Sequence, residues 1–376
     1  AAQDAAGNNS TAATQFTTNF DGTAPSVAIT SSLASSSTNG AFTATFTFSE
    51  AVTGFTAADV TTGNASVSNF SASSASVYTA TITPTSDGAV TVDVPANAAQ
   101  DAAGNNSTAA TQFTTNFDGT APTVAITSNL TGANTNAPFT ATFTFSEDVT
   151  GFTAADVTPG NASVSNFSAS SASVYTATIT PTSDGAVTVD VPANAAQDVA
   201  GNNSTAATQF TTNFDGTAPS VAITSSLSGA NTNAAFTATF TFSEDVSGFA
   251  ASNIATTNAN VSNFSASSAS VYTATITPTS DGAVTVDVPA NAAQDAAGNN
   301  STAATQFTTN FDGTAPTVAI TSNLTGANTN APFTATFTFS EDVTGFTAAD
   351  VTPGNASVSN FSASSASVYT ATITPT

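Results

Sequence analysis

The sequence predicts an all-β protein, built as a tandem array of small β-sandwich domains with a 97-residue repeat. The first observation is internal repetition: Phe-Asp-Gly-Thr-Ala-Pro begins at Phe20, Phe117, Phe214 and Phe311, each copy 97 residues after the one before. The second is the alternation of Phe or Val with Thr, which is the period of a half-buried strand. The third is a turn signal about every ten residues, as sandwiches show, with no helix-period segment of useful length.

The repeat sets the predicted domain boundaries. Complete repeats are expected at 21–117, 118–214 and 215–311. Residues 1–20 match the last strand of a preceding repeat, and residues 312–376 match a repeat without its last two strands. We therefore expect the chain to be a window from a longer array, in which each unit is large enough for a core of its own.

The strands of the first full repeat follow from alternating residues. Val27 and Ile29 predict a short first strand, and residues 42–48 alternate Phe or Ala with Thr. Residues 78–83 alternate in the same way, residues 90–94 carry Val at every second position, and residues 109–117 predict the last strand. With two shorter segments this gives about seven strands per repeat.

The remaining segments predict loops and short pieces. Residues 31–40 are rich in Ser, Thr and Asn and predict a loop, and residues 56–59 predict one helical turn. Residues 60–62 and 65–71 are expected to pair with each other across Gly63-Asn64. The side chains predicted to face the core are Phe46, Phe48, Tyr78, Ile82, Val90, Val92 and their counterparts 97 residues on.

The charge balance excludes several classes of function. The chain has 24 acidic residues and no Lys, Arg or His, which argues against binding nucleic acid or an anionic membrane surface. Without His, Cys or Lys there is no base or nucleophile suited to neutral pH, so we do not expect an enzyme. Since Cys is also absent, no disulfide braces these small domains, and a metal ion is the remaining brace.

Four motifs carry a family resemblance: Phe145 to Phe152, Tyr175 to Pro181, Asp198-Val-Ala-Gly-Asn-Asn and Asp215-Gly-Thr-Ala-Pro. They resemble the bacterial Ig-like repeats of very large surface adhesins. The resemblance implies immunoglobulin-like sandwiches that act as extenders outside the cell, project a terminal adhesive domain from its surface, and are often stiffened by calcium at their junctions.

Immunoglobulin-type topology gathers the acidic residues at one pole of each repeat. The second loop and the last loop lie at the same end as the entering linker, so the linker Asp, the Glu after the second strand and the Asp of the last loop should converge. The candidate metal ligands are Asp21, Glu50, Asp59, Asp101, Asn105, Asp118, Glu147, Asp148, Asp156, Asp198, Asn202, Asp215, Glu244, Asp245, Asp295, Asp312, Glu341 and Asp342.

Two interpretations of this pole stay open. An all-oxygen donor set without basic partners suits Ca²⁺. Alternatively, Asp-Gly and Gly-Asn are ordinary turn formers, and Asp101 could simply accept backbone amide hydrogen bonds. Because Ala51 occupies the position of Asp148, that acid is dispensable in either case.

The leading functional hypothesis is a calcium-stiffened stalk of a giant cell-surface adhesin. The alternative is a self-assembling extracellular filament or biofilm matrix fibre, with possible strand exchange between copies. A carbohydrate-binding module is less favoured, because Trp is absent and the four Tyr all occupy the same strand position. The expected partners are neighbouring repeats and, in the filament alternative, other copies of the array, with no nucleic acid and no membrane insertion.

Overall fold

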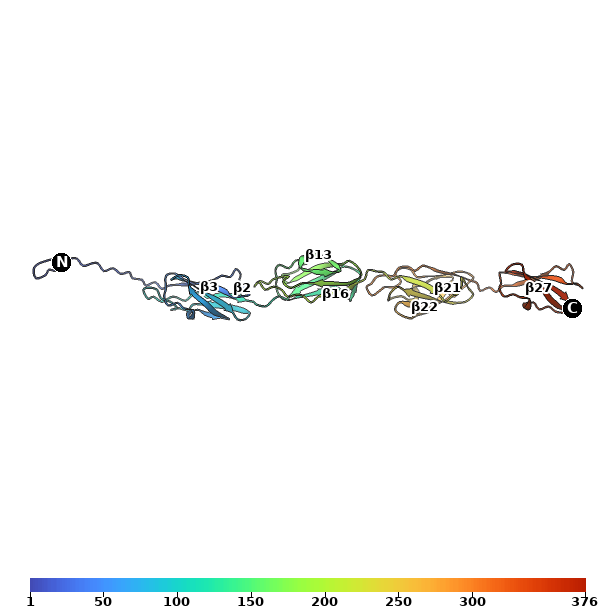
Figure 1. The fold of residues 1–376 in the computed structure, drawn as a ribbon, viewed down its shortest axis with the longest axis horizontal. Coiled ribbons are helices and arrows are strands. Elements are labelled where there is room, and N and C mark those ends of the chain that lie inside the picture. Colours follow the sequence, from blue (N-terminus) through green and yellow to red (C-terminus); the bar gives the residue numbers. More distant parts are fainter. The chain divides into compact units, whose positions relative to one another are not determined.

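The structure is a computed structural model that describes residues 1–376. Strands form every repeat, and the helical content is limited to three-residue 3₁₀ turns (Figure 1). The chain divides into two compact units, Ala1–Thr217 and Ala218–Thr376.

The first repeat is a sandwich of two four-stranded sheets. One sheet has the order β1-β3-β6-β5 and the other β2-β8-β7-β4. The only parallel pair in the two sheets is β2 with β8. The elements are β1 (Val27–Ser31), β2 (Ser37–Thr38), β3 (Phe42–Phe48), η1 (Ala57–Asp59), β4 (Thr61–Gly63), β5 (Ala65–Ala72), β6 (Val77–Pro84), β7 (Gly88–Asp93) and β8 (Phe113–Phe117).

The second and third repeats repeat this topology. The second contains β9 (Val124–Ser128), β10 (Asn134–Thr135), β11 (Phe139–Phe145), η2 (Ala154–Asp156), β12 (Thr158–Gly160), β13 (Ala162–Ala169), β14 (Val174–Pro181), β15 (Gly185–Asp190) and β16 (Phe210–Phe214). The third contains β17 (Val221–Ser225), β18 (Asn231–Thr232), β19 (Phe236–Phe242), η3 (Ala251–Asn253), β20 (Ala255–Thr257), β21 (Ala259–Ala266), β22 (Val271–Pro278), β23 (Gly282–Asp287) and β24 (Phe307–Phe311).

Residues 312–376 form a single four-stranded sheet, in the order β25-β26-β28-β27. Residues 16–20, which match β8 in sequence, form no strand, and Phe16 and Phe20 are exposed. The elements of the fourth repeat are β25 (Val318–Ser322), β26 (Phe333–Phe339), η4 (Ala348–Asp350), β27 (Ala356–Ala363) and β28 (Val368–Pro375).

The core lies where the alternation placed it. Phe46, Ile82, Val90 and Val92 are fully buried, and Phe48 and Tyr78 nearly so, which confirms the predicted inward faces. Phe55 joins them from the loop after β3 and packs edge-on against Phe46, Phe48 and Tyr78. The Tyr78 hydroxyl donates to the Val52 carbonyl at 3.2 Å, so its one polar atom is paired inside the core.

Three details differ from the sequence-based expectation. Each complete repeat has eight strands, because Ser37–Thr38 forms a two-residue strand inside the predicted loop. The predicted pairing of residues 60–62 with 65–71 is wrong: β4 pairs with β7 and β5 with β6, because Asn64, at a positive φ of 58°, turns the chain from one sheet to the other. The last strand begins at Phe113 and not at Ala109, because its ladder with β7 starts at the Val92–Phe113 pair.

Candidate metal centre

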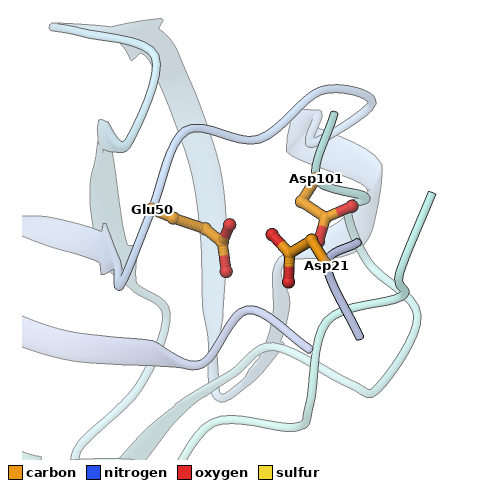
Figure 2. A group of neighbouring side chains, drawn as sticks. All are labelled: Asp21, Glu50 and Asp101. Carbon is orange, nitrogen blue, oxygen red and sulfur yellow. The ribbon is translucent and has the colours of Figure 1, made fainter. Parts of the chain in front are cut away.

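Three carboxylates converge at the pole of the first repeat. Asp21 comes from the entering linker, Glu50 from the turn after β3, and Asp101 from the loop between β7 and β8. One oxygen from each lies within 4.8 Å of the others. Figure 2 shows the Glu50 and Asp21 carboxylates turned toward one another, with Asp101 beside Asp21. The predicted convergence of linker, second loop and last loop is therefore present in the structure.

The Asp101 carboxylate is held by its own loop. Its Oδ1 accepts the amide hydrogens of Ala103 and Asn105, both at 2.8 Å, and its Oδ2 accepts from Asn105 Nδ2 at 2.8 Å. Gly104 closes the loop at a φ of 89°, a conformation that suits glycine. The Asn105 side chain and these amides lower the pKa of Asp101, so the residue enters the cluster as a charged, pre-positioned carboxylate.

Glu50 has the opposite electrostatic environment. Desolvation is the largest cause that raises the pKa of Glu50, and the negative charges of Asp21 and Asp101 raise it further. In the second repeat, desolvation likewise raises the pKa of Glu147, followed by the charges of Asp118, Asp198 and Asp87. With no basic side chain in the sequence, this negative charge has no protein counter-ion.

The cluster recurs with the repeat. Asp118, Glu147 and Asp198 also bring one oxygen each to within 4.8 Å, and the Asp198 loop repeats the bonds of the Asp101 loop. The 97-residue spacing gives Asp215, Glu244 and Asp295 as the equivalents in the third repeat. In the fourth, burial and the charge of Asp312 raise the pKa of Glu341.

Other candidate ligands lie outside these three-residue groups. Asp59 and Asp156 each accept the amide and hydroxyl hydrogens of the Thr three residues earlier, at 2.8 and 2.7 Å, and so cap a 3₁₀ turn. Asp148 is exposed beside Glu147, and Asp342 holds the equivalent position in the fourth repeat. Asp245, from the same position, lines a shallow pocket of about 210 Å³ that Asp295 also lines.

Asn105 and Asn202 use their side-chain amides as donors. Asn105 Nδ2 bonds to the Asp21 carbonyl at 3.1 Å as well as to Asp101, and Asn202 Nδ2 bonds to the Asp118 carbonyl at 2.7 Å and to Asp198. These residues therefore tie the linker to the last loop. Their assignment as metal ligands stays a prediction, as does that of the carboxylates.

The donor set fits a hard cation. Every side-chain ligand on offer is oxygen, which matches the preference of Ca²⁺ for 6–8 oxygens from carboxylates, carbonyls and water. Desolvation and the neighbouring carboxylates both raise the pKa of Glu50 and Glu147, so a cation at this pole would favour their charged forms. The turn-former interpretation also has support, because the Asp101 carboxylate accepts amide hydrogens from its own loop.

Sequence reasoning missed the partner of one more acid. Asp87 precedes β7 in an Asp-Gly turn, and its carboxylate bonds to linker residues Gly119 and Thr120. The Asp-Gly pair recurs at Asp184 and Asp281, so the repeat contained a signal. The sequence indicated only that this turn faces the junction, and not which atoms it holds.

Comparison with known proteins identifies the family. The bacterial Ig-like domain model matches residues 21–117, 118–214, 215–311 and 312–376. The chain belongs to the bacterial Ig-like domain family. This is the family whose repeats the four motifs resemble, and no curated protein matches the sequence.

Solved structures with similarity to these bacterial Ig-like domains include surface proteins. Invasin, a bacterial integrin-binding protein, is 17% identical, with 94% of this chain and 74% of that chain covered and a TM-score of 0.37. The Yersinia pseudotuberculosis adhesin InvE is 19% identical over 51% of this chain and 58% of that one, with a TM-score of 0.20. Domains 4–9 of the surface layer protein SbsC are 12% identical, with 79% of this chain and 49% of that chain covered and a TM-score of 0.21. No helix here has the length and apolar character needed to cross a membrane.

Proposed function

We propose that these Ig-like repeats form the extender of a bacterial cell-surface adhesin, and that calcium stiffens the junctions between them. One observation carries the proposal: Asp118, Glu147 and Asp198 bring their oxygens to within 4.8 Å of one another in a chain that has no Lys, Arg or His. Asp118 belongs to the linker, whereas the other two belong to the pole of the repeat that follows.

The physical effect follows from the charges. Without a cation, like charges at this separation repel, and the linker carboxylate is pushed away from the pole. A Ca²⁺ ion shared by the three carboxylates replaces that repulsion with coordination and ties the linker to the repeat. Removal of calcium should therefore loosen the junction without unfolding the sandwich, whose core lies in the strands.

The surface location and the stalk role rest on the family. Bacterial Ig-like domains in tandem suit a spacer, since each repeat has its own core and contacts mainly its neighbours. The partners in this proposal are the adjoining repeats, with other copies of the array as a second possibility.

The test is calcium titration of the chain, starting in chelator and followed by calorimetry, thermal unfolding and small-angle X-ray scattering. Calcium is expected to bind, to raise the melting temperature and to increase the maximum dimension. A site at one hundred times its Kd stabilises the folded state by about 2.7 kcal/mol. If millimolar calcium changes neither the melting temperature nor the maximum dimension, the proposal is wrong.

A matched pair of variants locates the ion. Glu147→Gln should remove one binding equivalent, because it neutralises the carboxylate that faces Asp118 and Asp198. Asp148→Ala is the control: it removes the adjacent exposed acid, at a position where the first repeat already has Ala51. Equal losses from both variants would point to general charge screening and not to a site. Association that grows with protein concentration would instead favour the filament alternative.

A further inference from the structure

The linker after the first repeat is hydrogen-bonded to that repeat through three consecutive residues. The Asp118 amide donates to the Thr38 carbonyl at 3.0 Å and so extends the parallel β2–β8 pairing by one residue. The Gly119 amide donates to Asp87 Oδ1 at 2.7 Å, and the Thr120 hydroxyl donates to Asp87 Oδ2 at 2.6 Å. Both oxygens of one carboxylate are thus used on neighbouring linker residues.

The strand register explains why Asp87 reaches the linker. Gly88 pairs with Phe117 at the end of the β7–β8 ladder, so the residue before β7 lies beside the residues after β8. The turn that carries Asp87 is itself held by Asn64. The Thr85 and Ser86 hydroxyls donate to Asn64 Oδ1 at 2.9 and 2.8 Å, and Asn64 Nδ2 donates to the Ser86 carbonyl at 2.6 Å.

The same contacts recur in the next two repeats. Asp184 accepts from Gly216 at 2.7 Å and from Thr217 at 2.5 Å, and Asp281 accepts from Gly313 at 2.6 Å and from Thr314. Hydrogen bonds to an ionised carboxylate are shorter and stronger than neutral ones. The contact is therefore a regular feature of the repeat.

The anchors of the linker change after Thr120, although one side-chain bond crosses this point: Asn202 Nδ2 of the second repeat donates to the Asp118 carbonyl at 2.7 Å. The Pro122 carbonyl accepts the Thr205 amide at 2.9 Å, and the Thr123 amide donates to Ser146 Oγ at 3.0 Å, so these residues are held by the second repeat. Between the two sets lies Ala121, whose backbone makes no hydrogen bond.

We propose that Asp87, Asp184 and Asp281 lock the linker to the repeat that precedes it, so that Asp118, Asp215 and Asp312 are presented by that repeat and the junction pivots at the following alanine. The lock needs no metal. It goes beyond the proposed function by assigning a positioning residue to the linker carboxylate, and only its consequence for calcium rests on that function. The cation would then bridge the pivot, with Asp118 on one side and Glu147 and Asp198 on the other.

The test uses pulsed electron paramagnetic resonance on the full chain, which has no natural Cys to interfere. One spin-label pair, Ser68→Cys with Ala121→Cys, measures whether the linker moves with the first repeat. A second pair, Ala121→Cys with Ser165→Cys, spans the pivot; Ser68 and Ser165 are exposed and equivalent. In chelator we expect a narrow distance distribution for the first pair and a broader one for the second.

Asp87→Ala should broaden the distance distribution of the first pair to at least the width of the second pair's distribution. Asp281→Ala is the matched control, because it removes the same contact from a different linker and should leave the first pair narrow. Asp87→Asn should restore the narrow width, since an amide can bond to both Gly119 and Thr120 if the hydroxyl accepts. The lock is refuted if Asp87→Ala has no effect, if Asp281→Ala has the same effect, or if Asn behaves like Ala.

Calcium separates this inference from the proposed function. Adding calcium should narrow the distance distribution of the second pair and leave that of the first pair unchanged. If Asp87→Ala broadens the distance distribution of the first pair but calcium does not change that of the second, the lock is supported and the metal proposal is wrong. If calcium narrows the distance distribution of the second pair but Asp87→Ala does not change that of the first, the metal proposal is supported and the lock is wrong. Asp87 is exposed, so the variant is expected to fold, and circular dichroism checks this.

Discussion

Within each repeat, the strands and the pole loops differ in where they place charge. The outward faces of β3 and β6 carry Thr at every second position and no acid, while their inward faces are apolar and buried. In the first repeat the acids lie in loops, in the 3₁₀ turn η1 or at a strand end: Asp21, Glu50, Asp59, Asp87, Asp93 and Asp101. The sandwich can therefore form without ions, whereas the junction holds carboxylates that repel one another. Stability and junction stiffness should respond to different substitutions.

The largest expected effect is in the strands. Phe143→Ala should destabilise the second repeat by about 3–5 kcal/mol, because the side chain is fully buried and its loss leaves a cavity. Chemical denaturation measures the loss, and distant repeats should unfold nearly unchanged. Thr144→Ala is the control, since this neighbour faces outward and should cost no more than about 0.5 kcal/mol. Similar losses for the two would contradict the assignment of inward and outward faces.

A smaller effect is expected at the pole when metal is absent. In chelator, Asp198→Ala leaves the Asn202 backbone amide without its acceptor, at a cost of about 1–3 kcal/mol if it stays dry, whereas the Gly201 amide keeps the carbonyl of residue 198. Asp198→Asn keeps an acceptor oxygen and should cost less. Equal unfolding free energies for wild type and Asp198→Ala in chelator would show that the loop bonds contribute nothing without the ion.

Some features of the strands could be predicted from the sequence and others could not. The alternation from Phe42 to Phe48 specified β3 and its buried face, because a strand of period two with one apolar side has a single register that buries it. The partner of Thr61–Gly63 could not be predicted in this way, since three residues carry too little pattern. It is the turn at Asn64 that sends β4 and β5 to opposite sheets.

The candidate site shows the same limit. Loop placement in a sandwich was enough to gather Asp118, Glu147 and Asp198, because it depends on strand order alone. The roles of the remaining acidic residues depend on which hydrogen bonds they make. The spacing from Thr153 to Asp156 is that of a capping box, which was an available signal for a helix cap. Nothing local in the sequence gave the reach from Asp87 to Thr120.

The smallest expected effect is a pH response of the lock. The Thr120 hydroxyl and the Gly119 amide lower the pKa of Asp87 below its ordinary value of 3.8. A carboxyl group with a lowered folded-state pKa contributes stability above its unfolded value and loses it as the pH falls through the folded value. The width of the Ser68–Ala121 distance distribution should therefore stay constant from neutral pH to about 3.8. Below that pH it should increase only slightly, because a protonated carboxyl, like the amide in Asp87→Asn, keeps both partners but loses the charge assistance. Broadening at mildly acidic pH would contradict this.

Two kinds of contact hold each linker, and both span less than one repeat along the chain. The Asp87–Thr120 contact spans 33 residues, and the Asn105–Asp21 contact, which links the first and last parts of a pole, spans 84. Both are shorter than the 97-residue period, so the gain or loss of one whole repeat by recombination would recreate every lock and every acidic pole around the new join. The number of repeats, and with it the reach of the array, can thus change in a single genetic event without a compensating substitution.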